Sequence, residues 1–74
     1  MQTLSVELFE TLPDDAKTIC VNGNGFAYGF SCNKRSLITN YKGFCLTTNC
    51  NIYWIGHGYN ASNWRDSVIE KQPV

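Results

Sequence analysis

Residues Thr18 to Phe30 read Thr-Ile-Cys-Val-Asn-Gly-Asn-Gly-Phe-Ala-Tyr-Gly-Phe, and this stretch decides the fold of the 74-residue chain. Two runs rich in β-branched and aromatic residues flank an Asn-Gly-Asn-Gly centre. Asn-Gly pairs between strand-forming runs are the strongest short-range signal of a β-hairpin. We therefore expect a hairpin here, and we expect the rest of the chain to pack around it.

The register of this hairpin is predicted by matching side chains across the two strands. A two-residue turn at Asn24-Gly25 places Val21 opposite Tyr28 and Ile19 opposite Phe30, so that one face is wholly apolar or aromatic. A four-residue loop over residues 22–25 keeps these side chains on the same face and remains an alternative. Either arrangement predicts one continuous core surface, with small residues on the opposite face.

Length and composition limit the class of protein. A chain of 74 residues is one small domain (1–74), and its 43% hydrophobic content with two Trp, four Tyr and four Phe residues is typical of an ordered globular chain. Six basic residues balance six acidic ones, so no overall positive field attracts nucleic acid or an anionic membrane. Neither a basic, apolar signal peptide nor a membrane-length apolar run is evident, which predicts a cytoplasmic protein without membrane contact.

Four cysteines require a separate prediction. Their even number suits two disulfides, and Cys45 and Cys50 together with His57 suggest a zinc site, although the spacing lacks two close pairs. In a reducing cytoplasm, buried thiols are the expected state of Cys20, Cys32, Cys45 and Cys50. We expect no cofactor and no metal, while the disulfide and zinc alternatives stay open.

The remaining segments predict further strands. Residues 4–9 alternate in polarity and indicate a strand or an extended arm, which Pro13 and the two following Asp residues end. Residues 37–39, 44–47 and 50–57 read as strands, and the last of these, apolar on both sides, as a central or covered one. Trp64 and Val68 lie four apart after an N-cap residue and predict a short helix. The expected fold is α+β or mainly β: a small antiparallel sheet of about four strands with one short C-terminal helix.

No catalytic set is evident. The only histidine is His57, and a lone His near Cys45 or Cys50 is weak support for nucleophilic catalysis. The pair Asp14-Asp15 follows a proline in a turn, where capping of backbone amides explains it. We therefore predict that the protein is not an enzyme.

Two binding functions are consistent with the aromatic content. The segment Gly25-Phe-Ala-Tyr-Gly-Phe30 resembles the aromatic strand motif of cold-shock and RNA-recognition domains, which predicts single-stranded nucleic-acid binding as an alternative function. The residues that would carry it are Phe26, Tyr28, Phe30, Lys34 and Arg35.

The favoured prediction is protein binding, because Tyr and Trp anchor protein interfaces and gather in the last third of the chain. The candidate partner-binding residues are Tyr53, Trp54, Tyr59, Trp64 and Arg65. Pairing of two copies through an exposed edge strand, giving a homodimer, also stays open.

The two ends of the chain resemble a group of small proteins. The start Ser5-Val-Glu-Leu-Phe-Glu-Thr-Leu-Pro-Asp-Asp15 and the close Asn63-Trp-Arg-Asp-Ser-Val68 are similar to those of small phage and prophage accessory proteins of unknown function. This resemblance brings no catalytic residues. It implies a bacterial host cytoplasm and a non-enzymatic accessory protein that binds and modulates or inhibits a bacterial host protein or defence complex.

Overall fold

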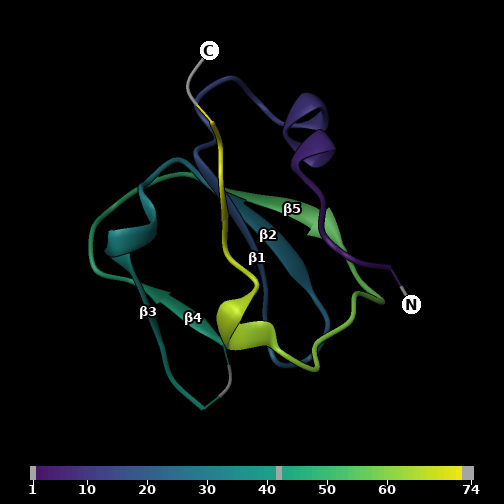
Figure 1. The fold of residues 1–74 in the computed structure, drawn as a ribbon. Helices are drawn as coiled ribbons and strands as arrows, with labels where there is room; N and C mark the ends of the chain where they lie inside the picture. Colours follow the sequence, from purple (N-terminus) through teal and green to yellow (C-terminus); the bar gives the residue numbers. More distant parts are fainter. Residues whose placement is uncertain (1, 42, 73–74) are drawn as a thin grey trace.

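The computed structural model describes residues 2–41 and 43–72. It contains a four-stranded sheet in the order β5-β2-β1-β6 and a separate two-stranded sheet of β3 and β4, and all strand pairs are antiparallel (Figure 1). The strands are β1 (Thr18–Val21), β2 (Ala27–Phe30), β3 (Leu37–Thr39), β4 (Phe44–Leu46), β5 (Ile52–Gly56) and β6 (Ile69–Glu70). The described residues also form three short 3-10 helices: η1 (Val6–Thr11) precedes β1, η2 (Lys34–Ser36) lies between β2 and β3, and η3 (Trp64–Asp66) lies between β5 and β6. The predicted fold class, a mainly β structure around a small antiparallel sheet, is confirmed.

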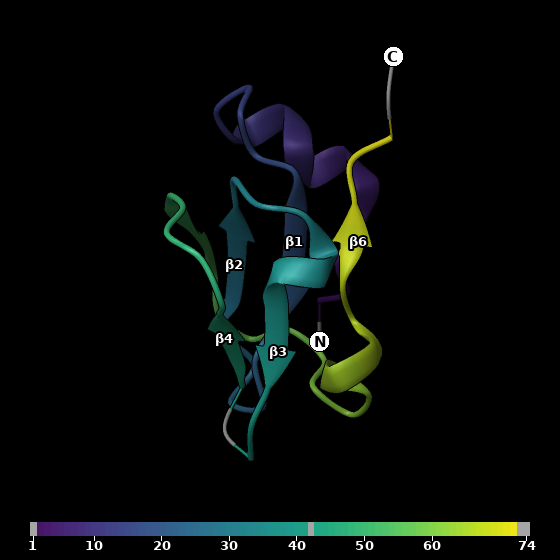
Figure 2. The same ribbon diagram turned by 90° about the vertical axis from the view of Figure 1, so that its left-hand side faces the viewer.

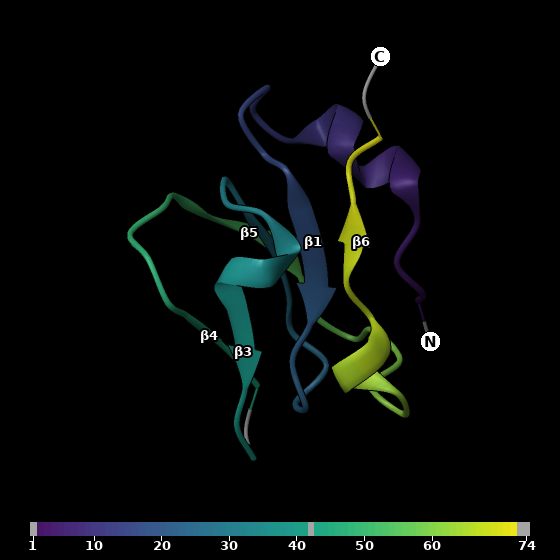
Figure 3. The ribbon, with the colours of Figure 1, turned by 60° about the vertical axis from the view of Figure 1, so that its left-hand side comes forward.

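The predicted hairpin forms the middle of the larger sheet. Strands β1 and β2 are its two central members, and all four residues of β1 are buried. Ile19 on one face and Cys20 on the other are both 0% exposed, so both faces of β1 are covered. Edge strands β5 and β6 then complete the sheet on either side, and Figure 3 shows β6 alongside β1.

The hairpin register differs from both predicted alternatives by one residue. Val21 pairs with Ala27 and Cys20 pairs with Tyr28, because the loop holds three residues. The N–H of Gly25 donates to the C=O of Asn22 at 3.0 Å, and Gly25 has φ +83°. This is a tight turn followed by a left-handed glycine, the usual form of a three-residue hairpin loop. The predicted two-residue turn at Asn24-Gly25 is therefore wrong.

A one-residue shift moves every side chain of β2 to the other face. Ile19 and Val21 share their face with Ala27 and Gly29 rather than with the aromatic residues. The single aromatic and aliphatic core surface predicted from face matching is consequently wrong. The chain instead builds two apolar layers, one on each side of the central hairpin.

The N-terminal segment covers the first face. The cluster of Phe9, Ala16 and Ile19 is extended by Leu8 and Leu12, so η1 lies over the aliphatic side of the sheet. The predicted strand over residues 4–9 is wrong, because this segment is largely a 3-10 helix. Leu8 and Phe9 of this helix and Leu12 just after it pack in the cluster of Ile19, and this burial outweighs the period-two pattern.

The second sheet covers part of the opposite face. Cys20, Phe30 and Cys32 form a cluster against which Leu37, Phe44 and Leu46 pack. Figure 1 shows η1 and the β3–β4 hairpin on opposite sides of the central sheet, and Figure 2 shows β3 and β4 in front of it. Strand β4 pairs with β3, whereas β5 pairs with β2.

The C-terminal helix predicted from Trp64 and Val68 is wrong. A single 3-10 turn, η3, is followed by β6, in which Ile69 pairs with Ile19. The β-branched pair Val68-Ile69 favours extended backbone, and Ile69 gains burial on the first face of the sheet. No helix in the described part of the chain is long and apolar enough to cross a membrane.

Candidate functional site

Four large side chains form a surface on β5, β2 and the residue just before β2, which we call the aromatic face: Phe26, Tyr28, Ile52 and Trp54. Tyr28 pairs directly with Trp54 across the two strands. The Trp54 ring meets the Phe26 ring at 5.3 Å between centroids and the Tyr28 ring at 5.4 Å, both edge to face. Such edge-to-face pairs are favourable contacts and hold the rings in place.

The aromatic face is open to solvent. Trp54 is 54% exposed, Ile52 is 56% exposed and Phe26 is 38% exposed. The β3–β4 hairpin packs over Cys20 and Phe30 on this side and leaves the β5 end uncovered. Contiguous exposed apolar side chains are unusual on a small protein and indicate an interaction surface.

The aromatic face borders a free strand edge. Among the strands that the structure describes, β5 pairs only with β2. Just before β5 begins, the Ser31 N–H donates to the Asn51 C=O at 3.1 Å, and the Asn51 N–H donates to the Ser31 side-chain Oγ at 2.8 Å. By the alternation of an antiparallel ladder, the N–H and C=O groups of Ile52 and Trp54 then point away from β2. The prediction of a central or covered strand over 50–57 is therefore wrong, because β5 is an edge strand.

The predicted partner-binding residues are separated in the structure. Tyr59 packs against Val21 and Ala27 in the core, and Trp64 is 9% exposed. The Trp64 ring lies between Phe44, which it meets edge to face, and the Arg65 guanidinium at 4.3 Å from its centroid. Tyr53 lies on the opposite face of β5, which leaves only Trp54 on the aromatic face.

The residues of the predicted nucleic-acid surface are also divided. Phe26 and Tyr28 belong to the aromatic face, whereas Phe30 is 5% exposed beneath the second sheet. Lys34 and Arg35 line a separate open hollow of about 650 Å³ with Asn33 and Glu70. The described lining of that hollow includes no residue of β2 or β5, so these positive charges lie apart from the exposed rings.

Ile52 is the member of the aromatic face that sequence reasoning missed as a candidate. Its spacing of two from Trp54 predicts that both side chains share one side of a strand. The missing information was the partner strand, because pairing with β2 places Ile52 beside Phe30 and Trp54 beside Tyr28.

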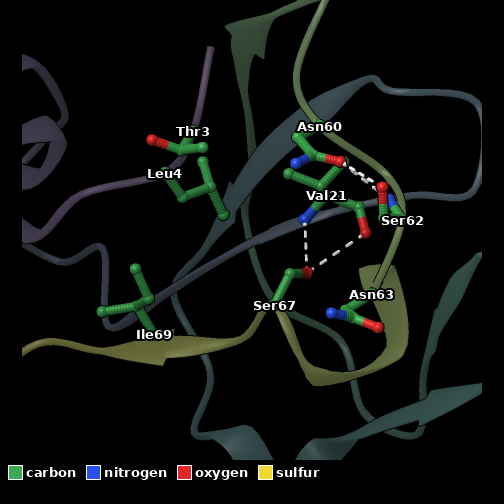
Figure 4. A pocket seen from close by; sticks show the side chains of 8 residues that line it. All are labelled: Thr3, Leu4, Val21, Asn60, Ser62, Asn63, Ser67 and Ile69. Atoms are coloured by element: carbon green, nitrogen blue, oxygen red, sulfur yellow. Dashed lines mark hydrogen bonds between the residues drawn. The ribbon is translucent and has the colours of Figure 1, made fainter. Parts of the chain in front are cut away.

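A second feature is a polar hollow of about 210 Å³ between the N-terminal segment, β1 and the C-terminal segment (Figure 4). The Ser67 hydroxyl accepts from the Val21 N–H at 2.9 Å and donates to the Trp64 C=O at 2.6 Å. Ser67 lies two residues before β6, so its hydroxyl bonds the part of the β1 edge that the backbone of β6 does not reach. The described lining residues are Thr3, Leu4, Val21, Asn60, Ser62, Asn63, Ser67 and Ile69. They include no imidazole or carboxylate to activate the hydroxyl, so the Ser67 contacts are structural.

The carboxyl group of Asp15 accepts two side-chain hydrogen bonds on the face of the sheet that η1 covers. The Tyr53 hydroxyl donates to Asp15 Oδ1 at 2.5 Å, and Asn51 Nδ2 donates to Asp15 Oδ2 at 3.1 Å. The hydrogen bond from Tyr53, and to a smaller extent that from Asn51, holds the pKa of the Asp15 carboxyl below its ordinary value. The same Asp15 contact raises the pKa of Tyr53. The cluster ties the loop before β1 to strand β5.

All four cysteines are free thiols in the structure. Cys20 and Cys32 are buried, and burial raises the pKa of Cys20 to about 12. Burial, followed by a hydrogen bond with Cys50, raises the pKa of Cys32 to about 11. Within residues 2–41 and 43–72, no three His, Cys, Asp or Glu side chains are grouped so that they could hold a metal ion.

Comparisons with protein-family models, with curated proteins and with solved structures find no match to this chain. The aromatic face is therefore interpreted from its own geometry.

Proposed function

We propose that this chain is a non-enzymatic protein-binding module that contacts its partner through the aromatic face. The observation that carries the proposal is the exposure of Trp54, Ile52 and Phe26 side by side on β2 and β5. Half-exposed aromatic side chains already ordered by neighbouring rings lose little conformational freedom on binding, which favours them as interface anchors. The adjacent free edge of β5 offers backbone donors and acceptors to an extended segment of the partner.

The resemblance of the chain ends to phage accessory proteins supplies the setting of this proposal. It makes a bacterial host protein or a defence complex in the host cytoplasm the partner that we propose. Binding would modulate or inhibit that partner by covering its surface, since the proposal assigns no chemistry to this chain.

The test is an affinity capture from bacterial lysate with the tagged chain, followed by measurement of Kd with the captured protein. We expect Trp54→Ala to weaken binding by about 2 kcal/mol or more, about thirtyfold in Kd, as for a central interface tryptophan. Ile52→Ala should weaken binding, while Ile38→Ala serves as the matched control. Ile38 is 53% exposed against 56% for Ile52, but it lies on β3. Equal effects of the two isoleucine changes would contradict the proposal.

Single-stranded nucleic acid is the second candidate, favoured by the exposed rings of Phe26 and Trp54 and the partly buried ring of Tyr28 beside them, because bases stack on aromatic side chains. A protein partner is favoured over nucleic acid for two reasons. Phe30 is buried, and Lys34 and Arg35 line a hollow apart from the aromatic face. Capture of abundant RNA with no specific protein, together with a low-salt gel shift that Trp54→Ala abolishes, would reverse the order of the two functions.

A further inference from the structure

Cys32 and Cys50 occupy opposing positions just beyond the end of the β2–β5 ladder. Phe30 pairs with Ile52, and the next pair, Ser31 and Asn51, is joined by hydrogen bonds of 3.1 and 2.8 Å. One further step along the same register brings Cys32 opposite Cys50. The fold thus brings together two cysteines that are 18 positions apart in sequence.

The two thiols lie on the same side of the sheet. Positions that face each other in an antiparallel pair share a face, and Cys50 packs against the cluster that contains Phe30 and Cys32. A contact with the Cys50 thiol also contributes, after burial, to the raised pKa of Cys32. The Cys32 backbone is also held, since its C=O accepts from Thr18 Oγ1 at 3.1 Å.

The pair has the backbone geometry that a disulfide needs. The Ser31 N–H donates to the Asn51 C=O, so continuing the antiparallel register puts Cys32 and Cys50 in a non-hydrogen-bonded position, where the Cα atoms of regular sheets lie about 4.5 Å apart. Disulfides span Cα separations of about 4.4 to 6.8 Å. A continued register therefore places the two Cα atoms within the range that a disulfide spans.

The other two cysteines lack this arrangement. Cys20 is buried on β1 and pairs with Tyr28, four residues before Cys32 on the neighbouring strand. Cys45 lies on β4, where its sulfur accepts from Asn40 Nδ2 at 3.0 Å. Cys32 and Cys50 are therefore the pair that the register selects.

We propose that Cys32 and Cys50 are a disulfide-forming pair that closes on exposure to a small-molecule disulfide such as oxidised glutathione. The partly exposed Cys50, as the thiolate, attacks one sulfur of the oxidant, breaks its S–S bond and releases one glutathione thiolate. The Cys32 thiolate then attacks the Cys50 sulfur, forms the Cys32–Cys50 bond and releases the second glutathione. The protein loses two protons and two electrons, and one glutathione disulfide becomes two thiols.

The bond would join the end of β2 to the start of β5, the two strands that carry the aromatic face. It would also close the loop of residues 33–49, which contains η2, β3 and β4. Constraining this loop in the unfolded chain stabilises the folded state. The proposal does not depend on the proposed function, because it requires no partner.

The test incubates the purified chain with reduced or oxidised glutathione, alkylates the remaining thiols and maps the products by mass spectrometry without reduction. Chymotrypsin is the protease of choice, because it cleaves after aromatic residues and leucine. Cleavage at Phe26, Tyr28 or Phe30 separates Cys20 from Cys32, and cleavage at Leu46 separates Cys45 from Cys50.

We expect oxidised glutathione to remove two alkylatable thiols, to yield a cross-linked peptide joining Cys32 to Cys50, and to raise Tm by more than about 5 °C. Cys45→Ser should close in the same way, whereas Cys50→Ser should give no internal cross-link. A stable glutathione adduct at Cys50 without closure, a Cys20–Cys32 cross-link, or no loss of thiols would each overturn the proposal. The wild-type map decides the outcome even where a variant folds poorly.

Discussion

At the scale of single residues, the Asp15 and Tyr53 pair shows how a surface bond joins distant parts of the chain. The carboxylate accepts from Tyr53 and Asn51, which lie 38 and 36 positions away in sequence. Since this bonding needs an ionised Asp15 and a neutral Tyr53, it also gives stability a defined dependence on pH.

The direction of this pH dependence follows from the pKa shifts of Asp15 and Tyr53. The folded pKa of Asp15 lies below its ordinary value of 3.8, so its stabilisation is present above that pH and is lost as pH falls through the folded pKa. The folded pKa of Tyr53 lies above its ordinary 10.0, so its contribution is present below about pH 10 and is lost as pH rises through the folded value.

We expect Asp15→Asn to lower Tm at pH 7, because the amide loses the charge-assisted part of both hydrogen bonds. The difference from wild type should shrink as pH falls below about 4, where the wild-type carboxyl also becomes neutral. Thermal unfolding, followed by circular dichroism from pH 7 to below about pH 4, measures this difference in Tm. The neighbouring Asp14→Asn is the control, and a Tm difference that stays constant with pH would count against the assigned role of Asp15.

At the scale of elements, the hairpin loop determines which side of the sheet each β2 residue reaches. Gly25 is the decisive residue, because its φ of +83° places it in the left-handed region and adds a third residue to the loop. A Cβ at this position would also stand 3.1 Å from the C=O oxygen of Tyr59. The turn, the register and the contact with the later loop are thus linked at one glycine.

Gly25→Ala should destabilise the fold by about 1 to 3 kcal/mol, the usual cost of a non-glycine residue held in a sparsely populated backbone region. Gly58→Ala is the matched control, because Gly58 has φ +77° and no atom within 4 Å of the added Cβ. Urea unfolding of both variants measures the difference. If Gly58→Ala costs as much as Gly25→Ala, the Tyr59 contact contributes nothing.

At the scale of the whole molecule, the structure divides its aromatic residues between a core that joins two sheets and a surface that stays open. Phe30 is 5% exposed and packs with Leu37, Phe44 and Leu46 of the second sheet. Trp54, two pairs along the same ladder, has no such cover. The β3–β4 hairpin decides which rings are structural and which can contact a partner.

Phe30→Ala should therefore cost about 3 to 5 kcal/mol of unfolding free energy, as expected for a buried aromatic residue. Trp54→Ala should cost much less, because about half of its surface is already in water. Denaturant unfolding of both proteins provides the comparison. A larger loss for Trp54→Ala than for Phe30→Ala would contradict the division into core and surface.

Local sequence signals predicted the positions of most strands, the hairpin at the centre of the sheet and the mainly β class. They succeeded because strand propensity and Asn-Gly turn chemistry act over a few residues. They failed at Gly25, because loops of two, three or four residues are all compatible with the sequence around it. They also failed at residues 4–9 and at the C-terminal helix predicted from Trp64 and Val68, where packing against the sheet outweighed the local pattern. Trp54 was recognised as a candidate contact, whereas Ile52 was recognised only once its partner strand was known.

The sequence by itself thus determined that this chain forms a small antiparallel β structure around residues 18–30. Only the tertiary structure decided which faces are buried, because a one-residue change of register moves every side chain across the sheet. It likewise decided that β5 is an edge strand and that Cys50 packs against the buried cluster that contains Cys32. Those outcomes depend on contacts between segments far apart in the chain, which no local pattern encodes.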